Sequence, residues 1–227
     1  MSCSKRAMMV LAMALAVAAS ASAQFGKRGG RGGPQAPTPS LDNAVMNSGA
    51  EYKMTTKGQD MDVAYAIVGK EDVNGEPGIW LETRMQSAEM GGETVTKMLM
   101  VTSGPEPGMK RMITQAPGHP PMEMTGMMMG MMKSHQPQES TGKPDRGELV
   151  GTESVTVPAG TFTCQHYRKQ DKGGQADYWV TTQVASFSRV KMTTPDTSMV
   201  LTKILTNETS HIKGEPQKIQ MPEMPHF

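Results

Sequence analysis

Apolar side chains recur at every second position through most of the chain from Gly49 onward. This alternation is typical of strands with one buried face, because successive side chains of a strand point to opposite sides. The clearest runs are Tyr52/Met54, Val63/Tyr65/Ile67 and Ile79/Leu81/Thr83/Met85, and further strands are expected over 94–102, 109–115, 148–157, 161–169, 175–182, 188–194 and 199–206. Turn residues such as those at 74–78 and 91–92 separate the runs and leave no room for crossover helices. The sequence therefore predicts a mainly β protein with a largely antiparallel sheet, arranged as a barrel, half-barrel or sandwich.

The first 23 residues have the three parts of a secretory signal peptide. Lys5 and Arg6 precede an apolar run over residues 7–18, and small residues lead up to Ala23, after which we expect cleavage. The apolar run is too short to cross a hydrocarbon core, which needs about 20 residues, and no later stretch comes close to that length. We therefore expect a mature protein in the periplasm or outside the cell, without a transmembrane segment.

The rest of the chain divides into a linker, one domain and a tail. Residues 24–44 are rich in Gly and Pro and predict a flexible linker. Residues 45–210 predict a single antiparallel β domain, and residues 211–227 predict a disordered tail. An insertion over residues 116–146, rich in Met, Pro and Gly, interrupts the β pattern and predicts one short helical segment or loop.

The mature chain is nearly neutral and contains one cysteine. Removing residues 1–23 takes away two cations and no acids, so the 23 Lys and Arg residues fall to 21, against 22 Asp and Glu. A neutral balance argues against a nucleic-acid partner, which a clustered positive charge would indicate. Only Cys164 remains after cleavage, so packing rather than an intrachain disulfide must stabilise the fold.

One predicted hairpin resembles a known family. Residues 151–164 read GTESVTVPAGTFTC, with the core V-P-A-G-T-F-x-C, and the runs at 176–180 and 189–191 continue the pattern. This order is similar to that of uncharacterised bacterial periplasmic or secreted domains allied to the LolA-like lipoprotein-carrier superfamily. The resemblance implies a curved antiparallel sheet, a half-barrel or open barrel around a hydrophobic cavity or a helix, whose concave face holds acyl chains in the carriers. The hairpin itself is a turn signature and contains no motif that transfers this activity.

The densest local feature is the segment 122–132, which has seven methionines in 11 positions and is flanked by histidines. Thioethers are soft ligands that suit Cu(I), and they combine readily with imidazole. One hypothesis is therefore a copper site whose candidate ligands are Met127, Met128, Met131, His119 and His135.

The same segment also fits a packing role. Its methionines include four at the spacing i, i+3, i+4 and i+7, which would form one apolar stripe on a helix. Unbranched thioether side chains adapt to irregular or changing surfaces, including a lipid tail, while Gly126 and Gly130 weaken the helix. The sequence favours this interpretation over copper. The candidate residues of such a movable ligand lid are Met124, Met127, Met128, Met131 and Met132.

Two residues of chemical interest share one predicted strand. Cys164 and His166 alternate onto the same face, where both could approach one metal ion. Two ligands do not make a site, and a buried free cysteine beside a satisfied histidine is the more common arrangement.

The motifs of common enzyme classes are missing. No G-x-S-x-G, H-E-x-x-H, P-loop or C-x-x-C sequence is present, so we expect neither enzymatic activity nor a cofactor other than copper. The sequence favours an exported, non-enzymatic protein that holds a hydrophobic or amphipathic, lipid-like ligand in a half-barrel cavity. The alternatives are a Met/His-rich copper-binding periplasmic protein and an envelope-associated structural or partner-binding module that uses open sheet edges or the Gly-rich tether. The oligomeric state is left open.

Overall fold

The computed structural model describes residues 44–124, 147–171 and 173–218. The regular elements in these ranges are twelve strands, and none of them is a helix. In chain order the strands are β1 (Ser48–Thr56), β2 (Gln59–Val73), β3 (Glu76–Gln86), β4 (Thr94–Val101), β5 (Gly108–Gln115), β6 (Met122–Met124), β7 (Glu148–Val157), β8 (Gly160–Asp171), β9 (Gly174–Val180), β10 (Arg189–Thr193), β11 (Thr197–Thr206) and β12 (Gln217–Lys218). They form a single sheet in the order β12-β6-β5-β4-β3-β2-β1-β11-β10-β9-β8-β7.

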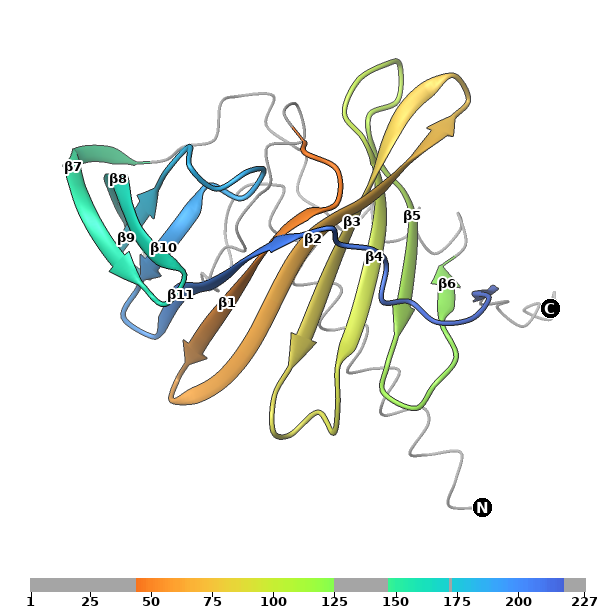
Figure 1. Ribbon diagram of the computed structural model, residues 1–227, viewed down its shortest axis with the longest axis horizontal. Coiled ribbons are helices and arrows are strands. Elements are labelled where there is room, and N and C mark those ends of the chain that lie inside the picture. The colour runs from red at the N-terminus through yellow and green to blue at the C-terminus, as the bar shows by residue number, and fades with distance from the viewer. Residues whose placement is uncertain (1–43, 125–146, 172, 219–227) are drawn as a thin grey trace, which may run out of the picture.

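Two antiparallel meanders meet in the middle of this sheet. β1 to β6 lie side by side in one half, β7 to β11 lie side by side in the other, and β11 pairs with β1 where the halves join. β12 is the exception to the antiparallel pattern, because it runs parallel to β6. The sheet stays open, with β12 and β7 at its two ends, and the β7–β11 half curls round relative to the β1–β6 half (Figure 1). The predicted curved, antiparallel half-barrel is therefore confirmed.

Irregular registers accompany this curvature. Shifts in register occur at Glu51/Tyr52, Ile67/Gly69, Leu99/Met100, Leu149/Gly151 and Arg189/Lys191, one in each of five strand pairs. A bulge bends its strand and increases the local right-handed twist. Because the shifts are spread over both halves, the whole sheet bends rather than one corner of it.

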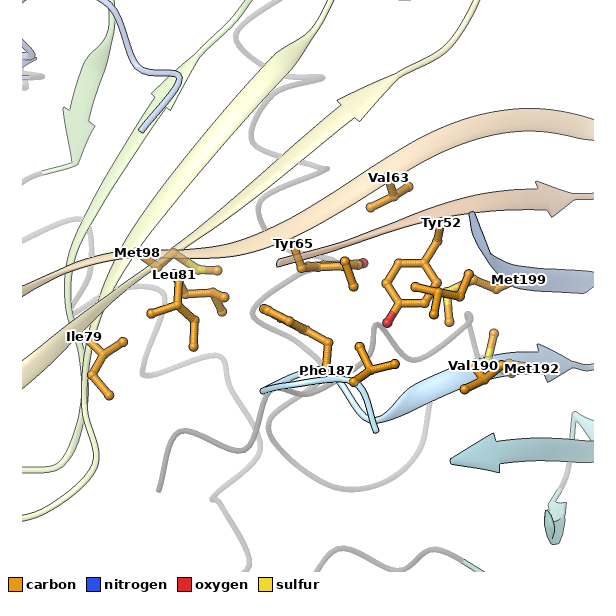
Figure 2. Close-up of a cluster of buried hydrophobic side chains, with 14 of the residues drawn as sticks. Tyr52, Val63, Tyr65, Ile79, Leu81, Met98, Phe187, Val190, Met192 and Met199 are labelled. Carbon is orange, nitrogen blue, oxygen red and sulfur yellow. The ribbon is translucent and has the colours of Figure 1, made fainter. Parts of the chain in front are cut away.

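One face of the sheet, here called the inner face, carries the main hydrophobic core. The largest fully buried apolar side chains on it include Tyr52, Ile67 and Phe187. The predicted alternation is confirmed, since Val63, Tyr65, Ile67, Ile79 and Leu81 are buried in this core and Met54 and Met85 pack against it. Figure 2 shows Tyr65 of β2 and Phe187 facing each other between the two halves of the sheet, with ring centroids 6.2 Å apart. The opposite, outer face has a smaller core of Trp80, Leu99 and Ile113.

The loop 181–188, which connects β9 to β10, contributes to the inner-face core although it has no strand pattern. Val184 and Phe187 are both buried in the core. Ser186 adopts a positive φ of 62°, and its hydroxyl oxygen accepts a hydrogen bond from the Val45 amide at 2.9 Å. This turn directs Phe187 inward, so a loop rather than a strand fills the space beside Tyr65.

Residues 207–218, here called the C-terminal strap, cross the outer face of the β1–β6 half (Figure 1). The Glu208 amide donates to the Asn47 carbonyl oxygen at 2.9 Å, the Lys213 amide donates to Gln115 Oε1 at 2.8 Å, and β12 pairs with β6. Residues 211–218 belong to the segment that the sequence predicts to be a disordered tail, and they instead follow the sheet to its edge strand. Residues 219–227 lie outside the described residues, as do the signal peptide, the linker up to residue 43 and residues 125–146 of the insertion.

Candidate functional site

The inner face of β2 to β6 carries a continuous line of apolar side chains. Register places Ile67 opposite Leu81, Leu81 opposite Met98, Met98 opposite Met112, and Met112 opposite Met124. Directly opposed residues of antiparallel strands share a face, with Cβ atoms about 5 Å apart, so these side chains are neighbours on one face across five strands, and all of them belong to the inner-face core. Met98, Met112 and Met124, here called the methionine row, occupy three adjacent strands of this line. All three are buried.

Threonines line the inner face beside the methionine row. Thr83 of β3 lies opposite Thr96 of β4, and Thr96 lies opposite Thr114 of β5. The hydroxyl oxygens of Thr96 and Thr114 are 3.4 Å apart, close enough for one to donate to the other. An apolar line bordered by hydroxyl groups is chemically suited to a molecule with an apolar body and a polar edge.

Met124 is placed differently from what the sequence predicts. It is not the first residue of a helical stripe but the last residue of β6, where it pairs with Met112 and is 7% exposed. Met124 is therefore part of the sheet and not of a cover over it. The other lid candidates, Met127, Met128, Met131 and Met132, lie outside the described residues.

Of the five candidate copper ligands, the structure places one. His119 is exposed in the turn between β5 and β6, where its amide donates to the Ala116 carbonyl oxygen at 3.1 Å. Met127, Met128, Met131 and His135 lie outside the described residues. Across the described ranges, no group of three or more His, Cys, Asp or Glu side chains is arranged to hold a metal ion.

Cys164 and His166 do not form a shared site. Cys164 is fully buried, its sulfur lies 3.7 Å from the Phe162 carbonyl oxygen, and burial, with a smaller effect of the Glu153 charge, raises the pKa of the thiol. His166 Nε2 is 2.7 Å from Asp177 Oδ1, and His166 Nδ1 is 3.2 Å from Glu153 Oε1. The arrangement is thus a buried free cysteine beside a satisfied histidine.

His166 is the centre of a polar cluster that links four strands. Its ring stacks on the ring of Trp179 in β9, with centroids 4.4 Å apart, and Trp179 Nε1 donates to Glu153 of β7. Lys191 Nζ of β10 lies over the Trp179 ring, 4.7 Å from its centroid. Both ring nitrogens of His166 face carboxylates, so neither is directed at a nucleophile.

Asp177 receives three hydrogen bonds within this cluster. Burial raises the pKa of Asp177, but hydrogen bonds from Gln175, His166 and Arg168 outweigh burial and leave the pKa below its usual value. The side-chain Nε2 of Gln175 donates to Asp177 Oδ2 at 2.7 Å, and Arg168 Nε donates to Asp177 Oδ1 at 2.9 Å. Sequence reasoning missed this cluster, because only the cross-strand register brings β7, β8 and β9 residues together.

A second polar network attaches the C-terminal strap to the outer face. Glu82 is fully buried and accepts hydrogen bonds from the Ser210 hydroxyl at 2.6 Å and from the His211 amide at 3.0 Å. Arg84 Nη1 lies 2.6 Å from Glu208 Oε2. These buried charges are paired with groups of the strap, so the network serves the fold rather than a ligand.

One cation lies beside the inner-face core. Arg189 stands at the start of β10, its guanidinium lies 5.2 Å from the centroid of the Tyr178 ring, and its carbonyl oxygen accepts a hydrogen bond from the Tyr52 hydroxyl at 3.0 Å. Burial lowers the pKa of Arg189, with opposing effects of neighbouring tyrosines. The inner face is therefore apolar along the methionine row and cationic at one place in the other half.

Comparisons with known proteins do not assign the chain to a family. No family model and no curated protein matches it. Among solved structures it is similar to a protein from Bacteroides fragilis NCTC 9343 described as exported with a YmcC-like fold, at 11% identity and a TM-score of 0.34, over 71% of this chain and 96% of that one. A protein from Parabacteroides distasonis ATCC 8503 described as a lipoprotein matches at 11% identity and a TM-score of 0.35, over 70% of this chain and 95% of that one. Likeness at this level is too weak to support the resemblance to LolA-like carriers.

The described residues contain no helix that is both long and apolar enough to span a membrane.

Proposed function

We propose that the protein is an exported, non-enzymatic binding protein that holds a hydrophobic or amphipathic ligand against the inner face of its half-barrel. The observation that carries this proposal is the methionine row with its neighbours Ile67 and Leu81, an apolar line that crosses five strands. Methionine side chains are flexible and polarizable, so they adapt to chains of different length and shape. The threonines beside the row and the Arg189 guanidinium in the other half suit the polar end of an amphiphile.

The first experiment tests whether the protein purified from the envelope already carries a bound ligand. The full chain is expressed with residues 1–23 in place, purified from the envelope without detergent, and examined by native mass spectrometry. We expect a polypeptide that lacks residues 1–23 and carries a lipid-like adduct. A processed protein with no adduct, and with no saturable binding of a fluorescent fatty acid, contradicts the proposal.

A pair of tryptophan variants locates the binding surface. Met98→Trp adds a bulky ring to the methionine row, whereas Ile204→Trp adds the same ring at a position that is 38% exposed. We expect Met98→Trp to weaken binding of the fluorescent fatty acid by about tenfold, which corresponds to about 1.4 kcal/mol. Ile204→Trp should bind as the unmodified protein does. Equal affinities for both variants, each shown to be folded by circular dichroism, would place the ligand elsewhere.

Copper binding is the second candidate function, and the clustered methionines between His119 and His135 favour it. Leucine keeps the apolar volume of methionine but removes its sulfur. We therefore expect replacement of Met127, Met128, Met131 and Met132 by leucine to weaken Cu(I) binding, measured against a competing chelator, if these residues are ligands. An unchanged affinity eliminates the copper hypothesis and leaves the apolar-ligand proposal intact.

A further inference from the structure

Asn74 and Gly75 form the tip of the hairpin that joins β2 to β3. β1 pairs with β2 only as far as Ile67, and β4 pairs with β3 only as far as Gly78, so the end of this hairpin projects beyond its neighbours in the sheet (Figure 1). Asn74 and Gly75 are both exposed. The tip is therefore open to water on the native protein.

An asparagine that is followed by glycine is prone to spontaneous deamidation. The main-chain nitrogen of the glycine attacks Cγ of the asparagine side chain, the new N–C bond closes a five-membered succinimide, and ammonia leaves. Water then opens the ring at either carbonyl and gives aspartate or isoaspartate. Glycine favours this attack because it has no Cβ to shield its nitrogen. Of the asparagines at positions 43, 47, 74 and 207, only Asn74 is followed by glycine.

The native conformation of the turn opposes this ring closure. Asn74 has a φ of 56° and Gly75 a φ of 86°, and a two-residue loop with these values is a type I′ turn. In a type I′ turn ψ of the first central residue is about +30°, which directs the Gly75 nitrogen away from Cβ of Asn74. Ring closure needs both on the same side, as in a type II′ turn, where ψ is about −120°. The Asn74–Gly75 peptide must therefore flip before the side chain can react.

Asp72 holds this peptide in the type I′ orientation. The Gly75 amide donates to Asp72 Oδ1 at 2.8 Å. A flip of the peptide reverses the direction of this N–H and breaks the bond. A Cβ built at Gly75 would meet no atom within 4 Å, so packing does not restrain the turn on that side. The hydrogen bond to Asp72 is thus placed to control the flip.

We propose that Asn74 is a site of spontaneous deamidation, and that Asp72 sets its rate by holding the Asn74–Gly75 peptide in the protected orientation. This inference is independent of the proposed ligand. Isoaspartate adds one carbon to the main chain, so the two-residue turn no longer matches the register of β2 and β3. Glu71 of this hairpin accepts hydrogen bonds from Trp80 Nε1 at 2.9 Å and Arg111 Nη1 at 3.0 Å. Ageing at the tip therefore loosens contacts on the outer face.

A pair of Asp72 variants tests the restraint. The full processed chain is kept at neutral pH, and conversion of Asn74 to aspartate or isoaspartate is followed by peptide mass spectrometry. We expect the folded protein to convert more slowly than the same chain in urea. Asp72→Ala should raise the rate in the folded protein about fivefold, because one exposed hydrogen bond no longer opposes the flip. Asp72→Asn keeps an acceptor oxygen and should convert more slowly than Asp72→Ala.

Two further measurements separate a local flip from general unfolding. Conversion of Asn47 and Asn207 in the same samples should not rise in Asp72→Ala, whereas amide hydrogen exchange at Gly75 should become faster. Absence of conversion at Asn74 in urea, or an unchanged rate in Asp72→Ala, overturns the proposal. So does a rise at all three asparagines, which would indicate unfolding. A lower rate in both Asp72 variants also overturns it, because the carboxylate would then assist the attack as a base.

Discussion

Two buried carboxylates in this protein join segments that are distant from each other in the sequence or lie on different strands. Asp177 receives hydrogen bonds from three side chains, and Glu82 accepts from the C-terminal strap while fully buried. A buried carboxylate is tolerated only when hydrogen-bonded partners replace water. Each therefore fixes the relative position of the segments that it joins.

Asp177 makes the folding stability of the protein depend on pH in the acid range. Its pKa is lowered in the folded state, so the stability that it contributes is present above the unfolded carboxyl pKa and is lost as the pH falls through the folded value. We expect the melting temperature of the unmodified protein to drop below about pH 4 more steeply than that of Asp177→Asn. Differential scanning calorimetry between neutral and acid pH measures both curves.

Asp60 provides the control for this prediction. Its pKa is also lowered, first by a hydrogen bond from Thr55 and then by Lys53, but its side chain is 57% exposed. Solvent screens an exposed ion pair, so Asp60→Asn should leave the fall of the melting temperature at acid pH almost unchanged. An Asp177→Asn curve that follows the unmodified protein throughout would show that the His166 cluster does not stabilise the fold.

At the scale of elements, the C-terminal strap holds the outer face of β3 to β6 together. It bonds to Glu82 and Arg84 of β3, to Gln115 of β5, and through β12 to β6. Because β6 is only three residues long, its place at the edge depends on partners on both sides. The strap thereby stabilises the strand that contains Met124.

Removing one carboxylate should weaken the strap measurably. Glu82→Ala leaves the Ser210 hydroxyl and the His211 amide without their acceptor, at a cost of about 1–3 kcal/mol in the free energy of unfolding. Urea denaturation measures this change, with Glu89→Ala as a control at an exposed position. Equal stability of the two variants would mean that the strap is not held by Glu82.

At the scale of the whole molecule, the sequence predicts the long strands well. Val63, Tyr65 and Ile67 alternate onto the inner face as expected, and Asn74-Gly75 turns the chain with positive φ at both residues. Such features are local, so they can be recognised without knowing the partner strand.

Features that depend on distant partners were not predictable in the same way. Met124 fits a helical spacing in the sequence, yet its pairing with Met112 places it in a strand. β12 is two residues long and is defined only by its parallel partner β6. Phe187 lies in a loop, and its burial follows from Tyr65 and the turn at Ser186. Glu153, His166 and Asp177 meet only through register.

The junction between β1 and β11 has a consequence for how the chain reaches its native state. The Thr202 hydroxyl donates to the Glu51 carbonyl oxygen across a separation of 151 residues, in the middle of the sheet. Closing so long a loop is entropically costly, and non-local pairing slows folding. Each meander can assemble from neighbouring hairpins, but the two can join only after β11 has emerged, so a chain exported in extended form would complete its fold only once nearly all of it had crossed the membrane.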